Sequence, residues 1–104
     1  MSRSTSPRAT VNVLRKRAQI YYTGRVQGVG FRYTVREVAC GFDVAGFVRN
    51  VTDGRVELVA EGEETEITEF LAGIKSSQLG SHIRTVDVNW LLATGEFKGF
   101  EVTR

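Results

Sequence analysis

The 104-residue sequence contains one cysteine, one proline and one histidine. A single cysteine, Cys40, excludes an intrachain disulfide, and no CxxC or CxxH zinc pattern occurs. No apolar run approaches the roughly 18 residues that span a bilayer. These absences exclude a disulfide-stapled scaffold, a zinc ribbon and a membrane-spanning helix, and they are compatible with a reducing cytoplasm. Cys40 follows a predicted helix and is interpreted as a small packing residue.

Positive charge is concentrated in one segment. Residues 1–17 carry five Lys and Arg side chains and no acid, so the formal net charge of +2 becomes −3 for residues 18–104. A mildly acidic domain is not expected to present a broad nucleic-acid footprint. The Ser/Thr/Arg-rich residues 1–17 are predicted to be a disordered basic extension, although their composition also fits a transit peptide. The remainder is predicted to form one domain.

Residues 18–104 alternate between strand-like and helix-like patterns. The predicted strands are 18–25, 44–50, 55–61, 83–93 and 97–103, and the predicted helices are 31–41 and 63–75. The Asp53-Gly54 pair predicts a hairpin turn. The order β-α-β-β-α-β, plus a short C-terminal strand, predicts an α+β fold of the ferredoxin-like, split-βαβ type. In this fold two helices would cover one face of an antiparallel sheet.

The segment GRVQGVGFR (24–32) joins the first predicted strand to the first predicted helix. Glycines let several backbone N–H groups point into one concavity, and a helix N-terminus adds partial positive charge. Arg32 is unfavourable beside that charge, but a planar guanidinium binds phosphate or carboxylate well. An anion site would explain its position; an ordinary glycine turn beside an exposed arginine is the alternative. The spacing fits neither a Walker loop nor a dinucleotide fingerprint.

The segment GFVRN (46–50) ends a predicted strand. Asn50 is typical of an Asx-type turn, but its amide also offers a donor and an acceptor that could hold a water molecule. Three other side chains are given structural interpretations. Glu57 is expected to be solvated, Trp90 to be in the core or in cross-strand packing, and His82 to be an incidental surface residue.

The two segments together resemble the acylphosphatase family. GRVQGVGFR (24–32) and GFVRNVTDGRVEL (46–58) carry the resemblance, with weaker similarity at AEG (60–62) and FKGFEV (97–102). It defines residues 18–104 as an acylphosphatase-like domain and leaves 1–17 outside. The segment LGSHIRTVDV departs from the family pattern, because His82 stands where we would expect a proline near Gly80.

The resemblance implies an enzyme that hydrolyses the carboxyl–phosphate bond of acyl phosphates to a carboxylate and inorganic phosphate, without metal or cofactor. It implies that Arg32 and the loop backbone bind phosphate and that Asn50 positions the attacking water. The phosphate-binding loop would comprise Gln27, Gly28, Val29, Gly30 and Phe31. The leaving carboxylate, whose conjugate acid has a pKa of about 4, departs without a general acid. We infer that the substrate phosphate accepts the proton of the water.

A small cytoplasmic monomer is expected, with the acyl phosphate and its phosphate product as partners, and with no membrane or nucleic-acid partner. The alternative is a non-catalytic phosphate- or anion-binding regulatory module on the same fold, because split-βαβ domains host many functions. The presence of both Arg32 and Asn50 favours the enzyme. An RNA-binding domain would need exposed aromatic residues on the middle strands, and a metal carrier would need paired cysteines.

Overall fold

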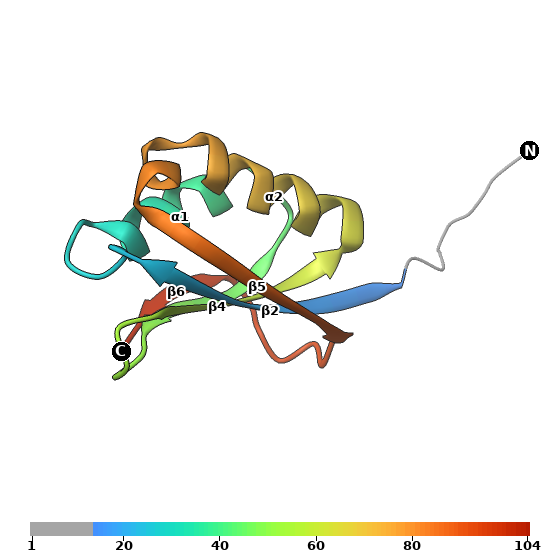
Figure 1. Cartoon of the computed structure of the whole chain (residues 1–104). Helices are drawn as coiled ribbons and strands as arrows, with labels where there is room; N and C mark the ends of the chain where they lie inside the picture. Colours follow the sequence, from blue (N-terminus) through green and yellow to red (C-terminus); the bar gives the residue numbers. More distant parts are fainter. Residues whose placement is uncertain (1–13) are drawn as a thin grey trace, which may run out of the picture.

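The computed structural model describes residues 14–104 (Figure 1). Its elements are β2 (Arg15–Gly24), α1 (Phe31–Ala39), β3 (Ala45–Asn50), β4 (Val56–Glu63), α2 (Glu64–Ser76), the 3₁₀-helix η1 (Gln78–His82), β5 (Ile83–Leu92) and β6 (Phe100–Thr103). The helices α1 and α2 lie on one face of a five-stranded sheet with strand order β5-β2-β4-β3-β6 (Figure 1). The predicted element order and the ferredoxin-like α+β fold class are confirmed; η1 was not predicted.

The sheet is mixed rather than purely antiparallel. The strand β2 pairs antiparallel with both β4 and β5, and β3 pairs antiparallel with β4. In contrast, β6 runs parallel to β3, with Gly46 opposite Phe100 and Val48 opposite Val102. The prediction of an antiparallel sheet was therefore wrong at this edge. The connection 93–99 crosses the width of the sheet and reverses the chain relative to β5, so β6 begins beside the start of β3 and runs parallel to it.

The boundary predicted between a disordered extension and the domain is also wrong by three residues. Arg15, Lys16 and Arg17 belong to β2, where they pair with Glu63, Gly62 and Glu61 of β4. Two of the three charges have partners: Lys16 Nζ lies 2.7 Å from a carboxylate oxygen of Glu64, and Arg17 Nε lies 2.7 Å from one of Glu61. Residues 1–13 of the predicted extension lie outside the described residues.

The core lies between the helices and the sheet. Each helix contributes an apolar stripe, and each inner strand contributes alternate side chains. The buried members are Ala18, Ile20, Tyr22, Val26, Phe31, Val35, Ala39, Val48, Val56, Leu58, Ala60, Ile67, Phe70, Ile74 and Leu79. Burying each large apolar side chain contributes about 1.5–3 kcal/mol. The rings of Tyr22 and Phe31 lie 5.2 Å apart, and this contact holds the first turn of α1 against β2.

Two carboxylates are buried on the other face of the sheet. Glu57 was expected to be solvated, but it is only 5% exposed. It accepts hydrogen bonds from Arg49 Nε at 2.6 Å and from Gln19 Nε2 at 2.8 Å. Burial alone would raise the pKa of Glu57, but the hydrogen bonds from Gln19 and Arg49 outweigh it and lower the pKa. The expectation failed because β4 is the middle strand and is covered on both faces.

Glu61 organises the connection between β5 and β6. Its carboxylate accepts hydrogen bonds from the backbone N–H groups of Thr94 and Gly95, at 2.9 and 3.0 Å, and from Arg17 Nε at 2.7 Å. Burial raises the pKa of Glu61, but these donors favour the charged form more strongly, so the pKa is lowered. Glu61 thereby holds the segment that delivers β6 to its place beside β3.

The interpretation of Cys40 as a packing residue was wrong. Cys40 is exposed, because α1 ends at Ala39 and Cys40 lies just beyond the buried stripe. Trp90 is 40% exposed on β5, which is an edge strand. No helix within residues 14–104 has the length and apolar character needed to cross a membrane.

Candidate active site

The loop between β2 and α1 depends on two glycines. Gly28 and Gly30 have φ values of 79° and 73°, in the left-handed region. A Cβ at either position would meet nothing within 4 Å, so the requirement for glycine comes from the backbone conformation and not from crowding. Gly30 is the residue before α1, and it provides no side-chain cap.

The beginning of α1 leaves backbone donors available. The first intrahelical hydrogen bond runs from Thr34 N–H to the carbonyl of Gly30, at 3.1 Å. The N–H groups of Phe31, Arg32 and Tyr33 precede it and have no intrahelical acceptor. No acidic residue occupies the first turn. This helix end therefore presents unpaired donors and partial positive charge, which suits an anion.

Gln27 connects the two sequence motifs. Its Nε2 donates to the carbonyl oxygens of Val51 and Arg55, both at 2.8 Å, in the turn between β3 and β4. The same turn is closed by a 2.8 Å hydrogen bond from Val51 N–H to the carbonyl of Arg55. The glycine loop and the end of β3 are thus held side by side, although more than twenty residues separate Gln27 from Val51 in sequence.

A pocket of about 270 Å³ lies where these segments meet. It brings together Gly28, Gly30, Phe31, Arg32 and Asn50, all of which belong to the predicted site. Two predicted loop residues do not line it: Gln27 serves as the tether, and the side chain of Val29 is 41% exposed. Val26 and Tyr33 complete the lining and had not been singled out. The pocket does not include His82.

Arg32 is oriented by the last strand of the sheet. It lies in the first turn of α1, and its Nη1 donates to the carbonyl oxygen of Thr103 in β6 at 3.0 Å. Sequence reasoning missed Thr103, because a backbone acceptor 71 residues away leaves no local signal. The bond uses one edge of the guanidinium and holds the group at the pocket.

Asn50 is the last residue of β3, and its side chain faces the same pocket. Its Oδ1 is buried and finds no hydrogen-bond donor among residues 14–104. A buried amide oxygen normally has a partner, so this atom calls for a donor supplied from the pocket. Water is such a donor, and donating one hydrogen bond leaves the lone pairs of its oxygen free to react.

The charges around the pocket favour an anion. Of the residues that line it, Arg32 alone carries a formal charge. Asp53, predicted to be the turn residue, accepts hydrogen bonds from Arg55 N and Nε at 3.1 and 2.8 Å. The backbone hydrogen bond from Arg55 is the main cause that lowers the pKa of Asp53. Within the described part of the chain, no three His, Cys, Asp or Glu side chains gather as metal ligands would.

Comparison with known proteins places this site in a family. The model of the acylphosphatase family matches residues 18–102. The acylphosphatase of Roseiflexus sp. is 42% identical over 86 residues, which cover 83% of this chain and 92% of that protein. That of Salinibacter ruber is 43% identical over 89 residues, covering 86% and 94%.

The same comparison holds in three dimensions. The crystal structure of acylphosphatase from Bacillus subtilis superposes with a TM-score of 0.78 at 35% identity, over 86% of this chain and 99% of that one. The family match spans both segments that form the pocket, from the glycine loop and Arg32 to Asn50. The chain belongs to the acylphosphatase family.

Proposed function

We propose that this chain hydrolyses acyl phosphates to a carboxylate and inorganic phosphate, without a metal or cofactor. The proposal rests mainly on one observation: glycines of the loop, Arg32 and Asn50 all line the same pocket. Membership of the acylphosphatase family supports the reaction class. The division of roles among the residues rests on the geometry of the pocket.

The phosphoryl group binds at the start of α1. The N–H groups of the loop 27–31 and of the first helical turn donate to its oxygens, and the guanidinium of Arg32 neutralises part of its charge. Gln27 keeps the loop in register with Asn50 through its two bonds to the β3–β4 turn. The donors are in place before the substrate arrives, which is the main requirement for stabilising a transferring phosphoryl group.

Asn50 orients the attacking water by accepting a hydrogen bond from it at Oδ1. The water oxygen attacks phosphorus while the bond from phosphorus to the acyl oxygen breaks, and the carboxylate leaves with the electron pair. The proton of the water passes to a phosphate oxygen, because Asn50 is not basic. No general acid is needed, since the carboxylate is stable at neutral pH. The protein thus contributes orientation and charge stabilisation.

We further propose that one chain suffices for activity and that the enzyme acts as a cytoplasmic monomer. Gln27 ties the two segments that form the pocket to each other within one chain. A lone exposed thiol, Cys40, offers no disulfide that an oxidising compartment would maintain.

The test is hydrolysis of benzoyl phosphate by the purified chain in the presence of a chelator. We expect turnover in the parent and in Asn89→Ala, which alters an exposed asparagine on β5, and a loss of about 10²-fold or more in kcat for Asn50→Ala. Phosphate should bind nearly as well to Asn50→Ala as to the parent. Phosphate binding without turnover in the parent would instead support the non-catalytic anion-binding module.

A further inference from the structure

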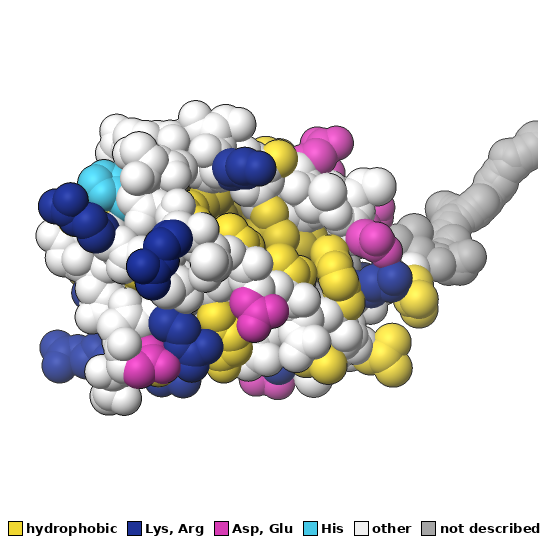
Figure 2. Space-filling view, in the orientation of Figure 1, with side chains coloured by type: hydrophobic (Ala, Val, Ile, Leu, Met, Phe, Trp, Pro, Cys, Tyr) yellow, Lys and Arg dark blue, Asp and Glu magenta, His cyan; other side chains and the backbone are white. Residues whose placement is uncertain are grey.

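An apolar groove runs between α2 and β5, apart from the site described above. It has a volume of about 430 Å³. Apolar side chains form most of its lining, and Figure 2 shows hydrophobic side chains along the hollow between these two elements. Leu71 of α2 and Val86 and Val88 of β5 line its apolar part, and Lys75 and Arg84 also line it.

The groove exists because α2 does not reach the edge of the sheet. On β2, Ala18, Ile20 and Tyr22 are at most 2% exposed. Their partners on β5 face the same side of the sheet, because residues opposite each other in an antiparallel pair share a face. Yet these partners, Trp90, Val88 and Val86, are 40%, 38% and 48% exposed. The helix-facing surface is therefore sealed over β2 and open over β5.

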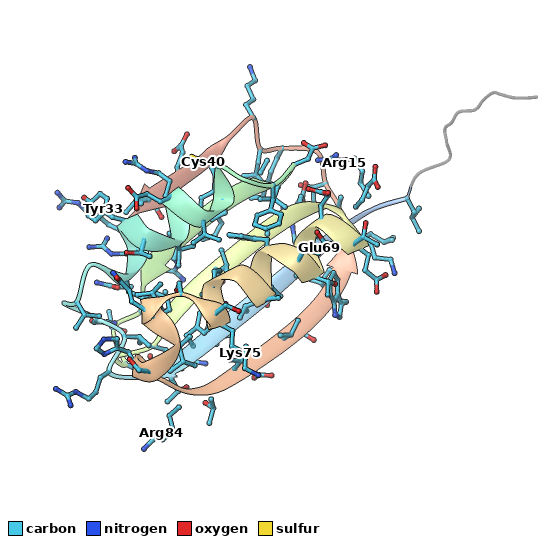
Figure 3. All side chains as sticks on the ribbon, turned by 90° about the horizontal axis from the view of Figure 1, so that it is seen from above. Arg15, Tyr33, Cys40, Glu69, Lys75 and Arg84 are labelled. Atoms are coloured by element: carbon cyan, nitrogen blue, oxygen red, sulfur yellow. The ribbon has the colours of Figure 1, made fainter. Side chains whose placement is uncertain are left out.

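Two cations stand at one end of the groove. Lys75 comes from the last turn of α2, and Arg84 comes from the start of β5 (Figure 3). Both side chains line the groove, and within residues 14–104 neither has a carboxylate at ion-pairing distance. The opposite end continues along the strand toward Trp90, two residues beyond Val88 and on the same face. The groove is thus positive at one end and apolar along its length.

We propose that this groove binds an amphipathic anion, namely an apolar carboxylate with an unbranched chain. The carboxylate lies between Lys75 and Arg84, and the chain lies along Val86 and Val88 toward Trp90. Its volume falls within the range of about 300–1,000 Å³ that is common for small-molecule sites. The inference does not depend on the proposed hydrolysis, because the groove shares no lining residue with the pocket of Arg32 and Asn50.

The charges disfavour a second copy of the chain as the occupant. Two copies paired along β5 about Val88 would place Arg84 of one copy opposite Leu92 of the other. The neighbour of Leu92 on β2 is Lys16, another cation. Such a dimer would bring no carboxylate from β5 to Lys75 and Arg84, whereas a carboxylate ligand complements both.

The experiment titrates decanoate, below its micelle concentration, into the isotope-labelled 104-residue chain and follows backbone amide signals by NMR. We expect saturable shifts centred on Leu71, Val86 and Val88. Decanol has the same chain without the charge, and it should bind about tenfold more weakly, as expected for a lost charge-assisted contact. The double variant Lys75→Gln/Arg84→Gln should lower the affinity for decanoate to that for decanol.

Matched variants separate the two parts of the site. Arg36→Gln/Lys98→Gln removes the same charge from exposed positions elsewhere and should leave decanoate binding unchanged. Val88→Asn alters a partly exposed floor residue and should weaken both ligands. The proposal is overturned if decanoate gives no saturable shift, if decanoate and decanol bind equally, or if sedimentation shows a ligand-free dimer that Val88→Glu dissociates. None of these readouts uses hydrolysis, so failure here leaves the proposed function intact.

Discussion

The guanidinium of Arg32 donates a hydrogen bond of 3.0 Å from Nη1 to the carbonyl oxygen of Thr103. This bond links the first turn of α1 to the edge strand β6, which is itself aligned by parallel pairing with β3. The guanidinium is planar, so fixing one of its N–H groups also fixes the direction of the others. The site is therefore pre-oriented by a strand that contributes no side chain to the pocket.

The replacement Arg32→Lys tests this orientation. Lysine keeps the positive charge but lacks the planar fork, so it cannot bind phosphate and Thr103 with the same geometry. We expect kcat/KM for benzoyl phosphate to fall by about 10²-fold or more, and inhibition by inorganic phosphate to weaken. Arg36→Lys, one turn further along α1, is the control and should behave as the parent. Parent-like activity in Arg32→Lys would show that charge alone suffices.

Gln27→Ala removes the tether between the glycine loop and the β3–β4 turn. Two hydrogen bonds to the carbonyls of Val51 and Arg55 are lost, so the free energy of unfolding should fall by about 1–2 kcal/mol. Because the loop and Asn50 are then held less firmly, kcat for benzoyl phosphate should also fall. Urea unfolding and steady-state kinetics measure the two effects. Gln78→Ala, at an exposed position of η1, should change neither, and a Gln27→Ala variant with parent stability would argue against the tether.

Gly30→Ala tests the left-handed backbone before α1. A Cβ there meets no neighbouring atom, so the whole effect comes from the φ of 73°. We expect a loss of about 1–2 kcal/mol in the free energy of unfolding, measured in urea. Gly99→Ala also places its Cβ in open space but carries no positive φ, and it should be nearly neutral. Gly30→Asn should lie between the two, because asparagine tolerates this conformation better than alanine. Equal losses in Gly30→Ala and Gly99→Ala would remove the conformational explanation.

The buried carboxylate of Glu61 predicts a pH dependence of stability. Its pKa is lowered in the folded state, so the unfolded chain binds the proton more readily. The stabilisation is therefore complete above the unfolded pKa of about 4.3 and is lost as the pH falls through the lower folded pKa. We expect the free energy of unfolding of the parent to fall between about pH 5 and pH 3, which is the range in which carboxylates titrate. Urea unfolding at several pH values measures it.

The variant Glu61→Gln assigns that loss to one group. It should be less stable than the parent at pH 7, because Arg17 loses one of its two charged partners, but it should lose less on acidification. Some loss remains, since Glu57 also has a lowered pKa. Glu69→Gln, on the exposed side of α2, should follow the parent at every pH. If Glu61→Gln lost as much as the parent, Glu61 would not be the responsible carboxylate.

Local signals allowed most of the fold to be predicted from the sequence, and they indicated where a candidate site lies. The periodicity of residues 31–41 and 63–75 located both helices to within about two residues at each end. The glycine spacing and the position of Arg32 indicated an anion site, and the pocket contains Arg32 together with Asn50. In each case the feature depends on neighbours in sequence, so it leaves a readable pattern.

The failures depend on neighbours in space. Alternation along 55–61 suggested that Glu57 faces solvent, but the central position of β4 and the partners Arg49 and Gln19 bury it. Trp90 was expected in the core or in cross-strand packing; it lies opposite Ala18 of β2, and the position of β5 at the sheet edge leaves it 40% exposed. The contact between Arg32 and Thr103 and the parallel pairing of β6 likewise require knowledge of the strand order, which periodicity does not contain.

The position of β2 between β4 and β5 has a consequence for how the chain folds. Its partners lie far along the sequence: Ala18 pairs with Ala60 on one side and with Trp90 on the other. Such non-local pairing requires large loops to close before the hydrogen bonds between the strands can stabilise the chain. Refolding is therefore expected in the millisecond-to-second range typical of high contact order. The chain's one proline, Pro7, precedes the sheet, so slow isomerisation of a prolyl bond has no place within residues 14–104. The topology would then limit the rate of folding. Until β5 pairs with it, the edge of β2 would expose unpaired backbone N–H and C=O groups to other unfolded chains.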